Sequence, residues 1–143
     1  MLTVEKSIVI NAPVEAIYTY LTDPTKATEW MTSLSEVRNI KGEGVGQTYD
    51  WTYRMMGIPL DGTTTVSEQT PNERIKYETT GGVTSAWDYS FAFDGKATTL
   101  KLKIDYTIPV PVLGKLAEKL VANRNERETE TNLANIKDCL ENA

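Results

Sequence analysis

The stretch that decides the fold is residues 49–55, which read Tyr49-Asp50-Trp51-Thr52-Tyr53-Arg54-Met55 and alternate large apolar or aromatic side chains with polar ones. The same alternation returns in residues 87–93, Trp87-Asp88-Tyr89-Ser90-Phe91-Ala92-Phe93. Successive side chains of a strand point to opposite faces, so each stretch predicts a strand with four large side chains on one face. A sheet face with so many aromatic side chains must be covered. The expected cover is a long helix near residues 112–141, at the end of the chain.

Further segments of the chain also read as strands separated by turn residues. The expected strands are residues 2–11, 35–41, 47–56, 60–68, 74–80, 85–93 and 98–108. Asp94-Gly95 lies between two alternating runs, which is a strong hairpin signal. Separators this short join antiparallel neighbours, because parallel strands need long crossovers. The pattern predicts an α+β protein built on a seven-stranded antiparallel sheet.

Two short helices are expected between the first two strands. The first has apolar side chains at the i, i+3, i+4, i+7 spacing of one helix face: Val14, Ile17, Tyr18 and Leu21. Asp23-Pro24 then opens the second short helix, because Asp is a good cap and Pro fits the first turn. Trp30 and Met31 end this helix.

The long C-terminal helix carries two apolar stripes. The stripes consist of Leu113, Leu116 and Leu120, and of Leu133, Ile136 and Leu140. At about 100° per residue they lie roughly opposite each other on a straight helix. Either the helix bends near Ala122, or the second stripe packs on the sheet and the first contacts another element, a partner or a ligand entrance. Extending the second stripe backwards brings Ala122, Glu126 and Thr129 toward the sheet, unless residues 123–132 are simply a solvated stretch.

Length and composition set limits on the function. A chain of 143 residues is most simply one domain, residues 1–143. The net charge of −5 argues against nucleic-acid binding, which needs a basic face. No apolar stretch approaches the length of about 18 residues that spans a membrane, and the N-terminus shows no secretory signal, so a cytoplasmic location is expected.

The absence of histidine removes the commonest general base. With a single cysteine, Cys139, the chain has neither the ligands of a typical zinc site nor an internal disulfide. No dinucleotide or P-loop motif occurs, because the glycine-rich residues 42–46 precede a strand and not a helix. We therefore expect no metal, no cofactor and no recognisable catalytic residue.

Four segments resemble motifs of one known family. They are Ile10-Asn11-Ala12-Pro13 with Ile17-Tyr18, Asp23-Pro24 with Glu29-Trp30, Gly44-Val45-Gly46-Gln47, and Val66-Ser67-Glu68-Gln69-Thr70-Pro71. In this order and spacing they cover nearly the whole chain, which resembles the START-like superfamily in its polyketide cyclase/dehydrase and lipid-transport group (SRPBCC). The resemblance implies a helix-grip fold, β-α-α-β6-α, in which a curved antiparallel sheet wraps around the C-terminal helix. It also implies a deep apolar cavity between sheet and helix.

Candidate ligand-binding residues follow from the aromatic strand faces, the second helix and the last helix. They are Trp30, Met31, Tyr49, Trp51, Tyr53, Met55, Trp87, Tyr89, Phe91, Ala122, Glu126 and Thr129, with Phe93 ending the second aromatic face. The strand residues either line a cavity or form an ordinary core. The resemblance implies that Trp30 and Met31 flank the cavity mouth, and the alternative is that they anchor the second helix on the sheet. Buried Tyr and Trp need partners for OH and NH, which favours the cavity.

Acid–base candidates are fewer. Asp50, Arg54 and Asp88 alternate with the aromatic faces and should point outward, and we expect these residues and Asp61 to be solvated surface charges. Glu126 with Tyr53 is the remaining pair.

Three functions are compatible with the sequence. The first is binding or transport of a small hydrophobic or amphipathic molecule, such as a lipid, quinone or polyketide-like compound. The second is a cyclase- or hydrolase-type enzyme, and the third is a protein-interaction module of the chaperone-cofactor type that uses the leucine stripe 113–120. The expected partner is a small ligand, and a weak homodimer is left open.

Overall fold

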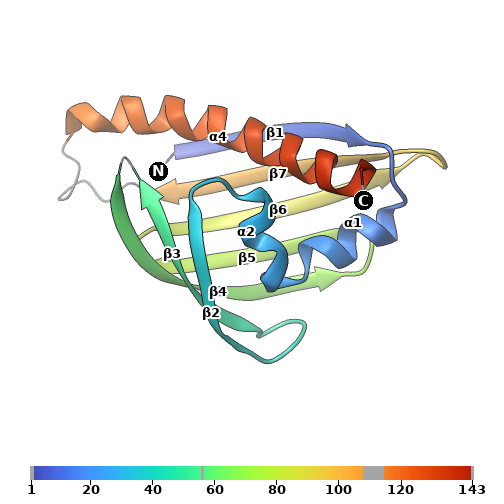
Figure 1. The fold of residues 1–143 in the computed structure, drawn as a ribbon, viewed down its shortest axis with the longest axis horizontal. Helices are drawn as coiled ribbons and strands as arrows, with labels where there is room; N and C mark the ends of the chain where they lie inside the picture. The colour runs from blue at the N-terminus through green and yellow to red at the C-terminus, as the bar shows by residue number, and fades with distance from the viewer. Residues whose placement is uncertain (1, 56, 108–114, 143) are drawn as a thin grey trace.

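A curved antiparallel sheet carries one long helix across its inner face (Figure 1). The computed structural model describes residues 2–55, 57–107 and 115–142, and in the last segment the side chains from Leu120 onward. The strands are β1 (Leu2–Ile10), β2 (Leu34–Lys41), β3 (Thr48–Met55), β4 (Ile58–Thr70), β5 (Arg74–Gly81), β6 (Thr84–Phe93) and β7 (Thr98–Thr107). The helices are α1 (Val14–Leu21), the 3-10 turn η1 (Pro24–Lys26), α2 (Ala27–Trp30) and α4 (Lys115–Glu141).

The seven strands are arranged in the order β1-β7-β6-β5-β4-β3-β2. From β2 to β7 each strand pairs with the next, and β1 pairs with β7 from Leu2↔Tyr106 to Ile10↔Thr98. β1 and β2 are therefore opposite edges of the sheet, and the segment α1–η1–α2 joins them across the inner face (Figure 1). This confirms the predicted helix-grip order and the α+β class.

Local signals explain the short elements. The Asp23 carboxylate accepts a hydrogen bond from the Thr25 N–H at 3.0 Å, so it caps η1 as its position before Pro24 predicts. In the β6–β7 hairpin, Gly95 has a positive φ of 98°, which residues with a Cβ rarely adopt. The Asp94-Gly95 turn thus forms where the sequence predicts it.

α4 is held on the sheet by apolar contact in the middle and polar contacts on both flanks. Leu133 and Ile136 are buried, which confirms that the second predicted stripe packs on the sheet. On one flank Lys137 Nζ donates to the Val9 carbonyl at 2.9 Å, and on the other Asn135 Nδ2 donates to the Trp30 carbonyl at 3.0 Å. Because these bonds reach β1 and α2, they fix the helix above the sheet.

Some predictions for the start of this helix lie outside the described residues. They concern residues 108–114, including Leu113, and the side chain of Leu116. Leu120 of the same stripe is 62% exposed. No helix among the described segments is long and apolar enough to cross a membrane.

Candidate functional site: an aromatic cavity between sheet and helix

A cavity of about 110 Å³ lies between the inner face of the sheet, α2 and the middle of α4. Its wall is built from the inward-facing side chains of β3 to β7, closed by the end of α2 and by one face of α4. The aromatic wall residues are Trp30, Tyr49, Trp51, Tyr53, Tyr77, Trp87, Tyr89 and Tyr106. Strand alternation explains this concentration, because every second residue of β3 and β6 faces inward.

All three tryptophans of the chain line this cavity. Trp51 is buried, and its indole N–H donates to Thr64 Oγ1 at 2.9 Å. Trp87 is half-buried, and its indole N–H donates to Ser85 Oγ at 2.9 Å. Both polar atoms are thus satisfied within the wall, which leaves the rings themselves as the surface offered to a ligand.

The Trp51 ring lies directly on the backbone of β4. A Cβ at Gly62 would overlap this ring and also crowd the Thr80 carbonyl of β5. Glycine at position 62 therefore allows the indole to lie against the sheet, which opens the space above it.

Tyrosine hydroxyls supply much of the polarity of the wall. Tyr77 donates to the Leu21 carbonyl at 2.9 Å. Burial raises the pKa of Tyr49 to about 12 and holds the pKa of Tyr89 well above the usual range of tyrosine. Tyr89 is 2% exposed, and its side chain lines the cavity. These tyrosines stay neutral at ordinary pH.

Among the described side chains of α4, the carboxylate that faces the cavity belongs to Glu128. The Tyr53 hydroxyl donates to Glu128 Oε1 at 2.8 Å, and the Thr32 hydroxyl lies 3.5 Å from the same oxygen. Burial, and then the adjacent Glu128 charge, raise the pKa of Tyr53 above its usual range. This pair is therefore a neutral phenol donating to a carboxylate.

The predicted partner of Tyr53 was Glu126, and that prediction is wrong. Glu126 is exposed and Ala122 only half-buried, and neither lines the cavity, whereas Asn125, Glu128 and Asn132 do. The buried face of α4 advances in steps of about four residues, which rotates it by roughly 40° per step relative to the helix axis. A long helix that crosses a twisted sheet changes its contact face in this way. The backward extension of the stripe therefore places Thr129 correctly but is wrong for Glu126 and Ala122.

Most of the predicted residues come together in the wall of the cavity. Those that line the cavity are Trp30, Met31, Tyr49, Trp51, Tyr53, Met55, Trp87, Tyr89 and Thr129. Phe91 does not, because it packs edge-on against Tyr18 of α1, with ring centroids 6.2 Å apart. Phe93 is 47% exposed at the end of β6. The inner face of β6 thus turns from cavity wall to core at the point where α1 covers it.

Sequence reasoning missed several wall residues. Tyr77 and Thr79 of β5 were available from strand alternation, as were Thr64 of β4 and Tyr106 of β7. These strands carry fewer aromatic residues than β3 and β6, so their inward faces give a weaker signal in the sequence.

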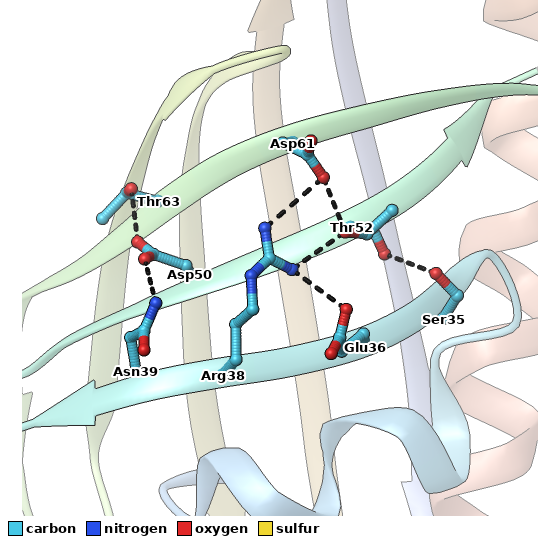
Figure 2. A network of polar contacts seen from close by, with 8 residues as sticks. All are labelled: Ser35, Glu36, Arg38, Asn39, Asp50, Thr52, Asp61 and Thr63. Carbon is cyan, nitrogen blue, oxygen red and sulfur yellow. Dashed lines mark hydrogen bonds and ion pairs between the residues drawn. The ribbon is translucent and has the colours of Figure 1, made fainter.

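The acidic candidates outside the cavity belong to the opposite face of the sheet. Figure 2 shows Asp50 and Asp61 in a polar network across β2, β3 and β4. The Thr63 hydroxyl donates to Asp50 at 2.8 Å, and the Thr52 hydroxyl donates to Asp61 at 2.6 Å. Hydrogen bonds from Asn39 and then Thr63 lower the pKa of Asp50. This network ties the strands together on the outside, as the alternation predicts.

The remaining two candidates are also remote from the cavity. Asp88 pairs with Arg74 through two hydrogen bonds, at 2.8 and 2.7 Å, and Arg54 is exposed. Within the described residues, no group of three or more His, Cys, Asp or Glu side chains could hold a metal ion.

Fold and site together define a helix-grip protein with an aromatic internal cavity. The sequence matches the family described as polyketide cyclase/dehydrase and lipid transport over residues 1–141, and the chain belongs to this family. None of the curated protein sequences compared with the chain matches it.

Solved structures share the fold at low sequence identity. TTHA0849 from Thermus thermophilus is 20% identical, with a TM-score of 0.86, over 99% of this chain and 98% of that one. The Zhui aromatase/cyclase from Streptomyces sp. R1128 is 18% identical, with a TM-score of 0.81, over 98% and 93%. The Aha1 dimer from Colwellia psychrerythraea is 20% identical, with a TM-score of 0.68, over 99% and 97%.

Proposed function

We propose that this protein binds or transports a small hydrophobic or amphipathic molecule in the cavity between sheet and α4. The observation that carries this proposal is the wall itself, where every tryptophan of the chain gathers around an interior space. Apolar burial would supply most of the affinity, and a few polar groups such as the Tyr89 hydroxyl would orient the ligand. A cytoplasmic location and a weak homodimer stay predictions of the sequence.

The size of the cavity limits what it encloses without rearrangement. An engineered cavity of about 150 Å³ binds benzene. A space of about 110 Å³ therefore suits a single small ring or a short chain, with larger parts of a ligand reaching out of the cavity.

Titration with fatty acids, quinones and flavonoid-like probes tests this function through tryptophan fluorescence. We expect saturable quenching or a spectral shift, since all three indoles line the cavity. Thr129→Leu fills the cavity from α4 and should weaken binding, whereas Thr131→Leu, on the exposed side of the same helix, should not. A wild-type protein that responds to no probe contradicts the proposal.

A cyclase- or hydrolase-type activity is the second candidate, favoured by the Glu128–Tyr53 pair facing the cavity. Incubation with a linear poly-β-ketone tests it. Turnover that Glu128→Gln abolishes and Glu126→Gln preserves would support an enzyme. An absence of turnover in the wild type, together with probe binding, would favour a carrier.

The protein-interaction alternative has less support. Leu120 is exposed, but single exposed leucines are common on protein surfaces. The side chains of Leu113 and Leu116, which complete its stripe, lie outside the described part of the chain.

A further inference from the structure

The charged residues among the described part of the cavity wall all have one sign. Among the described wall residues, two carry carboxylates, Asp23 and Glu128, and none is a lysine or arginine. Arg54 and Arg124 line a neighbouring surface pocket that shares Leu34 with the cavity. A ligand carboxylate inside the cavity would meet like charge from these described wall residues, because Arg124, whose charge acts on Tyr53, lies outside the wall.

Of the two carboxylates, Glu128 is the one open to a ligand. Asp23 is engaged in capping, because one of its oxygens accepts from the Thr25 N–H at 3.0 Å and the Thr25 hydroxyl at 2.6 Å. Glu128 is half-buried and receives its hydrogen bonds on Oε1 alone. It forms no ion pair with a lysine or arginine that the structure describes. A half-buried carboxylate in an aromatic wall favours a positively charged partner.

Aromatic rings stand next to this carboxylate. Tyr53 touches Glu128 through its hydroxyl, and the Tyr53 and Trp51 rings meet edge to face with centroids 6.5 Å apart. The faces of Trp and Tyr rings attract cations through their quadrupoles, and Trp is the strongest partner. A carboxylate and several indole and phenol rings around one small space form a site suited to an organic cation.

We propose that the ligand is a small organic monocation, namely a protonated amine attached to a single ring. Its ammonium group pairs with Glu128, and its ring lies among the tryptophans. This inference rests on the proposed function, because it names the ligand class for the same cavity.

The test uses three probes that share a phenyl ring on a short chain and differ in charge: 2-phenylethylamine, 2-phenylethanol and 3-phenylpropionate. Each probe is titrated at pH 7, and binding is followed by tryptophan fluorescence and calorimetry. We expect the amine to bind at least about tenfold more tightly than the alcohol, and the carboxylate to bind most weakly. Glu128→Gln should weaken amine binding by about tenfold and change alcohol binding by less than about twofold. Its amide oxygen still accepts from Tyr53, and circular dichroism checks its fold.

The matched control is Glu126→Gln, which removes the same charge from an exposed position of α4 that does not line the cavity. It should leave the binding of all three probes unchanged. Alcohol or carboxylate binding as tight as amine binding, or equal losses in the two variants, would overturn the cation inference and leave the proposed function standing. If none of the three probes binds while a fatty acid, quinone or flavonoid-like probe does, the cation inference fails and the proposed function stands.

Discussion

Two tryptophans of the wall, one on β3 and one on β6, occupy different environments. Trp51 is pressed against Gly62, and its indole N–H is satisfied by the buried Thr64. Trp87 is half-buried beside the cavity. The same residue type is therefore close to a packed core position in one case and a cavity wall in the other.

Replacing each of these tryptophans by Phe should separate the two environments. Trp51→Phe should lower the free energy of unfolding by about 1–3 kcal/mol, because it leaves a void and removes the partner of Thr64. Trp87→Phe should cost less than about 1 kcal/mol, because its surroundings are already incompletely packed. Urea denaturation gives both values, and probe titration should show altered affinity. A loss of more than about 3 kcal/mol in the free energy of unfolding at both positions, with unchanged probe binding, would contradict the assignment of a cavity.

At the scale of the element, α4 is the cover of the inner face of the sheet. Its apolar contact depends on Val121, Leu133 and Ile136, which are almost fully buried. Much of the rest of its length is polar, so it cannot be expected to form a stable unit away from the sheet.

Ile136→Asp should therefore unfold the domain. Ile136 is 0% exposed, and an unpaired carboxylate buried there costs several kcal/mol, on the order of the whole folding stability. Thermal denaturation measures the loss. Ala134→Asp introduces the same charge on the exposed side of α4 and should melt close to the wild type. A cooperative Ile136→Asp protein with wild-type melting would show that the buried face of α4 is wrongly assigned.

At the scale of the whole molecule, several tyrosines from different strands share one interior. Burial raises the pKa of Tyr49 to about 12 and also raises the pKa values of Tyr53, Tyr77 and Tyr89 above the usual range. The fold thus keeps a set of phenols protonated, each by removing it from water.

This arrangement predicts alkaline sensitivity. The unfolded chain releases tyrosine protons from about pH 10, whereas the folded protein holds them to higher pH. Stability should be complete below about pH 10 and fall as the pH rises toward 12, by up to about 1.4 kcal/mol per pH unit for each such group. Denaturation at a series of pH values measures this slope, and Tyr49→Phe should reduce it. A stability that stays constant over this range would show that these hydroxyls are solvated.

The alternation of residues 49–55 and 87–93 was enough to predict the strands and the faces of most of their side chains. A strand has a period of two, so the inward set is determined as soon as one large residue is placed inside. The order of the elements then predicted the helix-grip fold, which the strand order confirms.

Only the tertiary structure decided which residues meet across the cavity. Helical periodicity could not choose Glu128 over Glu126, because the contact face of α4 rotates as the helix crosses the twisted sheet. Nor could alternation separate Tyr89, on the cavity, from Phe91, under α1, since both share one strand face. Periodicity is a property of one element, whereas a cavity is enclosed by several, and their crossing points depend on packing that no local pattern records.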